Sequence, residues 1–350
     1  MTFHGACRCC TSRRAFIGGV SAFAASALVP TASAQARSRL DVHHHIFPEP
    51  VLKLQEKLNP AWGRLGPPRS LKQWSPSIMI EAMDRDGVAA ALGSSPGEAA
   101  WFGDVAAARK IMRAWNDYAA DLVRDHRARF GFFAVVAPPD VDGSLAEISY
   151  ALDALHADGI GFHSNYDGKY LGDPAFAPLF DELNRRKAIA YVHPTTAPCC
   201  RNAQPGIRTN LLEFPFDTTR TIVSLLFSGT LARCPDIRFI FSHGGGTMPM
   251  LAGRIELLAA DYKGLREKIP AGIPRELKGL YTDTAGTTSP AAIQATISVT
   301  SPAHVLFGTD FPYLSIAAAN RGLASANLPD DLMRLIEREN ALTLFPRFLA

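Results

Sequence analysis

Short apolar runs alternate with longer segments of helical periodicity along most of this chain. Eight runs have the length and composition of buried strands: Leu40–His45, Val88–Ser94, Phe130–Ala137, Ile160–Ser164, Ile189–His193, Ile237–His243, Leu280–Thr284 and Val305–Asp310. Between them apolar residues recur every three or four positions, as at Leu145, Ile148 and Leu152, which is the spacing of one helix face. This alternation predicts a (β/α)8 TIM barrel. An open doubly wound sheet is the alternative, although no glycine-rich dinucleotide motif follows the first run.

The first apolar run ends in three consecutive histidines. Because a strand alternates faces with period two, His43 and His45 point one way and His44 the other, toward the barrel wall or its helices. Two imidazoles on one face can bind a single metal ion. A chance or exposed histidine run is the alternative, but the strand-like flanking residues favour the metal site.

Three later runs also end in polar residues, namely His193, His243 and Asp310. In a parallel barrel the carboxyl ends of all strands lie on one face, so these side chains should converge with those of the first run. A single strand-end histidine is more often structural. Together the imidazoles and the carboxylate suit one divalent transition ion, zinc above all, with a position open for water or substrate.

The first residues of the chain have the composition of an export signal. Ser12-Arg13-Arg14-Ala15-Phe16-Ile17 is a twin-arginine pattern, followed by an uncharged run to Val29 and by Ala32-Ser33-Ala34. This order predicts a twin-arginine signal peptide over residues 1–34, a single domain over 35–350 and a periplasmic location. The apolar run is shorter than the ~20 residues of a membrane span, so no membrane association is expected after cleavage. An uncleaved anchor is the alternative.

Composition of the remaining chain excludes some classes of protein. The 350-residue chain has 36 basic and 33 acidic residues; without the leader's three arginines the two are equal. We therefore expect no nucleic-acid surface. Three cysteines lie outside the leader, Cys199, Cys200 and Cys234, too few for a disulfide framework.

Several sequence motifs resemble one known family. They are Asp41-Val42-His43-His44-His45, Tyr191-Val192-His193-Pro194, Glu213-Phe214-Pro215-Phe216-Asp217-Thr218-Thr219-Arg220, Ser242-His243-Gly244-Gly245-Gly246, and Gly308-Thr309-Asp310-Phe311-Pro312. In these the chain resembles the amidohydrolase superfamily, and within it the metal-dependent decarboxylases similar to aminocarboxymuconate semialdehyde decarboxylase. The resemblance covers nearly all of the chain after the leader.

The resemblance implies roles for the matching residues. His43, His45, His193 and Asp310 would hold the metal, and His243 would lie just beyond it as an acid–base or orienting group. Asp310 would also take part in catalysis.

Substrate-binding residues are predicted less directly. Arg254 would help to bind a substrate carboxylate, in one version across the interface of a homodimer; a solvated or salt-bridged helix arginine is the alternative. Arg64 and Trp62, in the long loop after the first run, are further pocket candidates. His163, on the fourth run, either lines the pocket or forms a hydrogen bond within the barrel.

The number of metal ions follows from the fourth run. Binuclear members of the superfamily use a lysine or glutamate there, but this run, Ile160–Ser164, has neither. We therefore expect one divalent ion, zinc first and manganese second.

Two reactions fit these residues. The first is non-oxidative decarboxylation of a small unsaturated or aromatic carboxylic acid, such as a hydroxybenzoate or a muconate-like acid, with a protein group placing a proton on the carbon that loses CO2. The second is hydrolysis of a lactone or amide by metal-bound water. The motifs specific to the decarboxylases favour the first. A non-catalytic periplasmic binding protein is a third hypothesis, which the full set of metal ligands disfavours.

Overall fold

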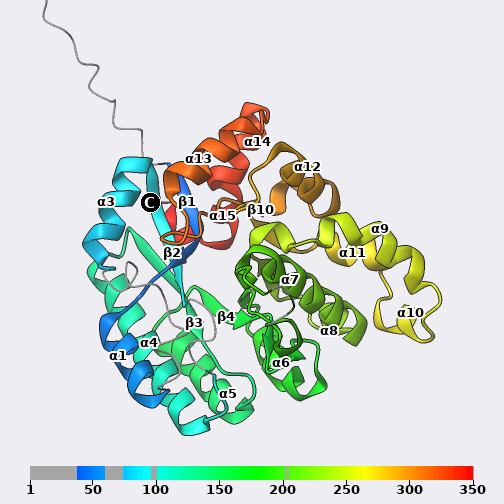
Figure 1. Ribbon diagram of the computed structural model, residues 1–350, viewed down its shortest axis with the longest axis horizontal. Helices are drawn as coiled ribbons and strands as arrows, with labels where there is room; N and C mark the ends of the chain where they lie inside the picture. Colours follow the sequence, from blue (N-terminus) through cyan, green and yellow to red (C-terminus); the bar gives the residue numbers. More distant parts are fainter. Residues whose placement is uncertain (1–37, 60–73, 96–100, 202, 204, 350) are drawn as a thin grey trace, which may run out of the picture. The chain divides into compact units, whose positions relative to one another are not determined.

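Eight parallel strands form the centre of the computed structural model, which describes residues 38–59, 74–95, 101–201, 203 and 205–349 (Figure 1). They are β1 (Arg39–His45), β2 (Val88–Ser94), β3 (Phe130–Val135), β4 (Gly159–His163), β7 (Ile189–His193), β8 (Arg238–Phe241), β9 (Tyr281–Asp283) and β10 (Val305–Leu306). They pair in this order. The predicted TIM barrel is confirmed.

Backbone hydrogen bonds between β1 and the segment that follows β10 close the ring. The Val42 amide donates to the carbonyl of Phe307 at 2.9 Å, and the Asp310 amide donates to the carbonyl of His43 at 2.8 Å. The His45 amide donates to the carbonyl of Phe311 at 2.8 Å. These bonds exclude the open sheet.

Helices cover the outside of the sheet (Figure 1). They are α1 (Glu49–Leu58), α3 (Pro76–Asp86), α4 (Val105–Asp125), α5 (Val141–Ser149), α6 (Ala177–Arg185), α7 (Thr209–Ser228), α8 (Thr230–Arg233), α9 (Met248–Ala259), α10 (Leu265–Lys268), α11 (Ile273–Lys278), α12 (Pro290–Val299), α13 (Ile316–Ser325), α14 (Asp330–Arg334) and α15 (Asn340–Leu344). An antiparallel ribbon, β5 (Asn165–Tyr166) with β6 (Lys169–Tyr170), follows β4. Within the described ranges, every helix is too short or too polar to cross a membrane.

Below the histidines the barrel interior is apolar. Leu40 and Leu306 are fully buried there, and the ring of Phe133 stacks on that of Tyr191 with 4.6 Å between centroids. Phe345, just after α15, packs against Phe133 and belongs to the same cluster. These side chains fill the barrel below the histidines, so a ligand can reach the histidines only from the carboxyl ends of the strands.

Several strands end earlier than the apolar pattern predicts, and two of these early ends affect the site. The sixth predicted strand extends to His243 but β8 ends at Phe241, and the eighth extends to Asp310 but β10 ends at Leu306. His243 and Asp310 have φ values of 55° and 60°, in the left-handed region that a strand cannot contain. Both strands therefore end before these two residues, at Phe241 and at Leu306.

Candidate metal centre

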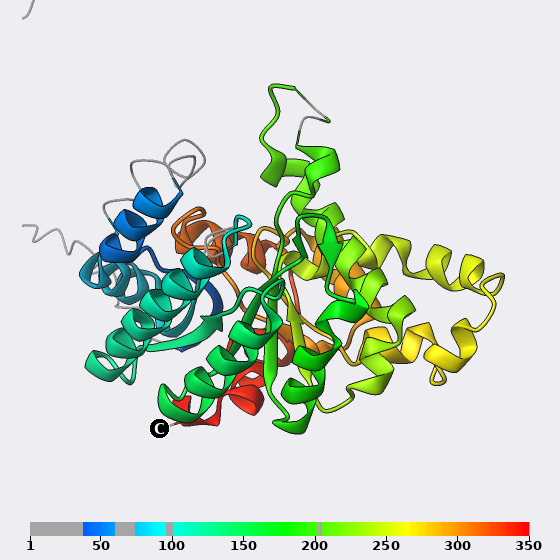
Figure 2. The same cartoon turned by 90° about the horizontal axis from the view of Figure 1, so that it is seen from below.

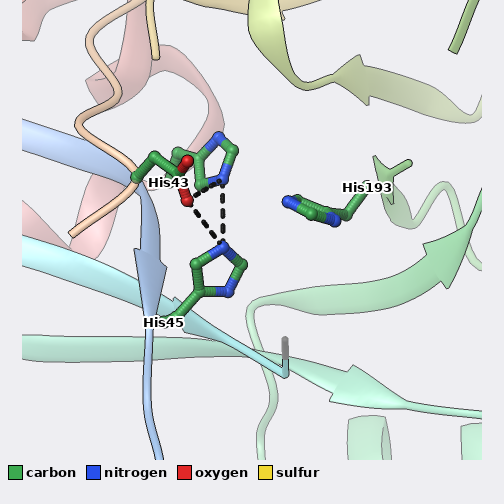
Figure 3. A group of neighbouring side chains, drawn as sticks. His43, His45 and His193 are labelled. Atoms are coloured by element: carbon green, nitrogen blue, oxygen red, sulfur yellow. Dashed lines mark hydrogen bonds and ion pairs between the residues drawn. The ribbon is translucent and has the colours of Figure 1, made fainter. Parts of the chain in front are cut away.

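Four predicted ligands converge at the open end of the barrel. One donor atom from each of His43, His45, His193 and Asp310 lies within 4.8 Å of the others. The imidazoles come from the ends of β1 and β7 and point toward a common centre (Figure 3). All three histidines are at least 95% buried. The predicted grouping is thus present in the fold.

The hydrogen-bond partners of His45 and His193 decide which ring nitrogen is free. The Ser94 hydroxyl donates to the carbonyl of His44 at 3.2 Å, so its oxygen accepts a bond from His45 Nδ1 at 3.1 Å. The Pro194 carbonyl accepts a bond from His193 Nδ1 at 2.9 Å. Each ring therefore holds its proton on Nδ1 and presents the Nε2 lone pair to the centre, as a metal ligand must.

His43 is oriented in the same way by a carboxylate. Its Nδ1 donates to Asp283 Oδ2 at 2.9 Å, and its Nε2 lies 3.3 Å from His45 Nε2. Two facing Nε2 atoms suit a shared cation between them once His43 has lost its second proton. The donor set and its orientation therefore fit a single divalent ion.

The pKa values of the ligands depend on burial and on the nearby carboxylates. Burial and the neighbouring imidazoles lower the pKa of His193 well below its usual value, and burial lowers that of His45. Burial also lowers the pKa of His43, but Asp283 and Asp310 outweigh it and raise that pKa to about 10. In the metal-free chain a proton therefore occupies His43, and a divalent ion must displace it.

Asp310 is the acidic member of the group. Burial opposes its ionisation, but the imidazoles of His243, His43 and His45 hold its pKa well below the usual range. Its Oδ1 lies 3.0 Å from His45 Nε2. The left-handed backbone at Asp310 costs conformational energy for a residue with a Cβ, and the closing hydrogen bond to His43 holds it there.

His243 lies beside the ligand group, as predicted. Its Nε2 is 3.7 Å from Asp310 Oδ2, and its backbone amide donates to Asp283 Oδ1 at 3.0 Å. The glycines that follow are required by close packing: a Cβ on Gly246, whose φ is 68°, would lie 2.1 Å from the Pro215 carbonyl oxygen of α7. The turn therefore fixes His243 between β8 and α7.

His44 points away from the centre, in agreement with the strand period. Its Nδ1 contacts Asp41 Oδ2 at 2.5 Å, and its ring lies 4.9 Å from that of Phe311. Asp41 also accepts bonds from the hydroxyl of Thr309 at 2.6 Å and from the backbone amide of His43 at 3.0 Å. Asp41 therefore holds the histidine strand against the segment that carries Asp310.

Asp283 and Ser94 also belong to the site, but they were not among the residues predicted from the sequence. Asp283 accepts bonds from His43 and from the His243 amide, and Ser94 accepts one from His45. Both are polar residues at the carboxyl ends of barrel strands, β9 and β2. Their position at a strand end is the feature that could have indicated them, since the metal ligands were identified by the same feature.

A pocket of about 320 Å³ opens onto the metal ligands. It is lined by His193, Asn210, Leu211, Phe214, Pro215, His243, Gly286, Thr287, Asp310, Tyr313 and Leu314. Ligand pockets of this kind combine mainly apolar walls with a few polar groups, and this one is at the small end of the usual range. A single substituted ring or a short acid fits it.

Two of the four predicted substrate-binding residues, His163 and Arg254, are among the described residues, and neither lines this pocket. His163 is buried on β4, where burial lowers its pKa to about 4, and it lines a small cavity with Ser94, Tyr191 and the metal ligand His193. Arg254 is exposed on α9 and does not line the pocket of its own chain. Arg64 and Trp62 lie outside the described residues.

Comparison with known proteins identifies the family. The sequence model of the family described as amidohydrolase matches residues 40–347. The chain belongs to the amidohydrolase family.

The similar proteins within that family are decarboxylases. Decarboxylase yanB of Aspergillus niger is 36% identical over 330 residues, covering 89% of this chain and 88% of that protein. The 6-methylsalicylic acid decarboxylase acuB of Aspergillus aculeatus is 35% identical, covering 88% and 96%. The 2-amino-3-carboxymuconate-6-semialdehyde decarboxylase of Dictyostelium discoideum is 26% identical, covering 79% and 82%. The predicted resemblance to this group of carboxy-lyases is confirmed.

A solved structure supports the fold. The 5-carboxyvanillate decarboxylase of Novosphingobium aromaticivorans, solved with manganese and 4-hydroxy-3-methoxy-5-nitrobenzoic acid, superposes with a TM-score of 0.79. It is 20% identical to this chain, and the match covers 89% of this chain and 98% of that one. The barrel prediction is therefore confirmed by comparison as well as by strand order.

Proposed function

We propose that this enzyme is a metal-dependent, non-oxidative decarboxylase of a hydroxybenzoate-type aromatic acid. The observation that carries the proposal is the set of three Nε2 lone pairs and one carboxylate directed at a common centre beside a largely apolar pocket. The similarity to a 6-methylsalicylic acid decarboxylase supports an aromatic acid with a hydroxyl group beside its carboxylate. A muconate-like acid is the second substrate class.

The residues of the pocket divide the work of binding and proton transfer. Phe214, Leu211 and Tyr313 supply apolar walls for the ring. A divalent ion held by His43, His45, His193 and Asp310 would supply Lewis-acid chemistry that stabilises negative charge on the substrate. His243 Nε2 delivers a proton to the ring carbon that loses CO2, and Asp310, whose Oδ2 lies 3.7 Å from that atom, helps to hold the imidazole in place.

We propose zinc as the metal and manganese as the second choice. Three imidazoles and one carboxylate form a donor set that zinc favours, while a structural neighbour was solved with manganese. Metal analysis of the purified full chain tests this: one zinc or manganese per chain is expected, and two per chain would contradict the single-ion site.

The reaction is tested with a panel of hydroxybenzoates, a muconate-type acid and lactones. CO2 release and ring opening are measured in parallel on metal-loaded protein. We expect CO2 release from at least one 2-hydroxybenzoate. Ring opening of a lactone without CO2 release from any acid would replace this proposal by the hydrolase.

We further propose a homodimer in which the α7–α9 surface is buried. Leu211, Met250, Leu257 and Tyr262 are 60–78% exposed on or beside these two helices. A group of large exposed apolar side chains is typical of an interface between protein chains. Arg254 lies on α9 within this surface, which supports a role for it at the pocket of a neighbouring chain.

Light scattering tests the dimer, and Arg254→Ala tests the residue. The variant should raise KM for the acid several-fold. The matched control Arg321→Ala, on exposed α13, should leave KM unchanged. A monomer at micromolar concentration would contradict the proposal.

We also propose export to the periplasm by the twin-arginine route, on the basis of the residues around Arg13 and Arg14. Cell fractionation with the double variant Arg13→Lys and Arg14→Lys tests this. The variant should accumulate in the cytoplasm, and equal export of both forms would contradict the route.

A further inference from the structure

Two adjacent cysteines lie at the open end of the barrel and have no part in the proposed reaction. Cys199 and Cys200 belong to a short 3-10 turn, Pro198–Cys200, in the loop between β7 and α7. This loop projects beyond the barrel rim (Figure 2). Cys199 is exposed and Cys200 partly so, and their Sγ atoms are 2.9 Å apart. The two thiols are therefore in contact and open to solvent.

Adjacency determines what kind of disulfide these thiols can form. Neighbouring Cα atoms across a trans peptide are ~3.8 Å apart, whereas bridged cysteines usually have Cα atoms ~4.4–6.8 Å apart. A bond between neighbours is therefore strained. Strained and exposed disulfides have more oxidising potentials and are readily reduced. Such a bond would form and break reversibly, unlike a structural disulfide.

The surroundings assign different roles to the two thiols. The hydrogen bond between them raises the pKa of Cys200 to about 11, despite the nearby Arg220 guanidinium. An external disulfide must reach the attacking sulfur, and Cys199 is the more exposed of the two, so Cys199 is the first nucleophile. Cys200 is in position to resolve the product because its sulfur is already in contact with that of Cys199.

We propose that Cys199 and Cys200 are a redox-active vicinal dithiol, oxidised to a disulfide within the pair by exchange with a small-molecule disulfide. The Cys199 thiolate attacks that disulfide, forms a mixed disulfide and releases one thiolate. Cys200 then loses its proton and attacks Cys199 Sγ, which releases the second thiol. Two protein thiols are oxidised and one external disulfide is reduced to two thiols.

The metal ligand on the same loop is shielded from this change. His193 and the residues up to Ala197 are buried, and the Thr195 amide donates to Ser164 Oγ at 2.9 Å. Exposure begins only at Pro198. Cys200 instead shares a small recess with Arg208, Thr209 and Leu212 at the start of α7. Oxidation should therefore leave metal binding intact.

Peptide mapping of the full chain tests the site directly. Protein is incubated with oxidised or reduced glutathione, alkylated and digested with trypsin, which yields one peptide, residues 188–201, containing both cysteines. After oxidation this peptide should be two hydrogens lighter and free of alkyl groups, and dithiothreitol should restore two alkylation sites. The buried Cys234 lies in a separate peptide and serves as an internal control. Two alkylatable thiols after oxidation would overturn the proposal.

Single variants test the order of attack. Cys200→Ser should trap glutathione on Cys199, while Cys199→Ser should react more slowly at Cys200; Cys234→Ser should leave oxidation of the pair unchanged. Stable glutathione adducts on the wild-type pair, or equal rates for the first two variants, would overturn the assigned roles. Metal content per chain should be the same before and after oxidation, and loss of metal would overturn the claim that the ligands are shielded. These readouts do not depend on decarboxylase activity.

Discussion

The two sides of the active site differ in how firmly they are held. On the β1, β9 and β10 side two buried carboxylates hold His43. Asp41 accepts bonds from the amides of His43 and Thr309, and Asp283 accepts bonds from the His43 ring and the His243 amide. On the β7–α7 side the pocket is lined by Leu211, which is 73% exposed, and by the half-buried Phe214. The β1, β9 and β10 side contains most of the metal ligands, and the β7–α7 side contains most of the apolar wall of the pocket.

This difference separates reactivity from substrate choice. A metal site needs ligands held in one orientation, and buried carboxylates supply this because they fix the imidazole tautomers. A pocket wall on a projecting loop and helix can change without disturbing those ligands. Substitutions on the first side should therefore affect metal binding and turnover, and those on the second side should affect KM.

The largest effect is expected at Asp310. Asp310→Asn removes a ligand charge and the carboxylate beside His243, so turnover of the active acid should fall by ~10³-fold or more. Steady-state kinetics on metal-loaded protein measures this. Asp153→Asn, at an exposed ion pair with Arg186, is the control and should retain activity. CO2 release at the wild-type rate with metal bound would rule out a role for Asp310.

A smaller effect is expected at Asp283, which touches His43 but is not a ligand. Asp283→Asn removes the charge that orients this imidazole, and metal affinity should weaken by ~10–100-fold. Competition with a chelator measures it. Asp261→Asn, on the exposed surface, should bind metal as the wild type does. Unchanged metal affinity in Asp283→Asn would mean that metal binding by His43 does not depend on this buried carboxylate.

The pH dependence of metal binding also tests whether the buried carboxylates control His43. Because Asp283 and Asp310 raise the pKa of His43 to about 10, below that pH the ion must displace a proton, and affinity should fall ~10-fold for each unit that the pH decreases. Chelator competition between pH 6 and 9 measures the slope. The slope should be shallower in Asp283→Asn. A flat profile in the wild type would show that His43 is already neutral without metal.

On the opposite side, Phe214→Leu should raise KM by up to ~10-fold with metal content unchanged, since a change of a few carbon atoms in an apolar pocket costs ~1–3 kcal/mol. Phe214 packs edge-on against His193, with 5.9 Å between ring centroids. Phe227→Leu, farther along the same helix and packed on Tyr262, is the matched control. Loss of metal from Phe214→Leu would show that the two sides are not independent.

Much of the barrel was predictable because its physical signals are local. Burial on both faces gives parallel strands continuous apolar runs, and all eight runs correspond to observed strands. The ligands were predictable because parallel topology brings strand ends together. The early ends of β8 and β10 could not be predicted from the sequence. The left-handed backbone at His243 and Asp310 is held by hydrogen bonds to distant segments, which no local pattern encodes.

The sequence by itself determined the barrel, the four ligands and the face that they share. The spacing of apolar residues, the length of the apolar runs and the order of the strands are all properties of the chain. Only the tertiary structure decided which nitrogen of each histidine is free, because Asp283, Ser94 and the Pro194 carbonyl select the tautomers. It also placed Arg254 outside the pocket of its own chain, and His163 in a smaller cavity that shares His193 with that pocket. Such assignments depend on contacts between residues far apart in the chain, and these contacts exist only after folding.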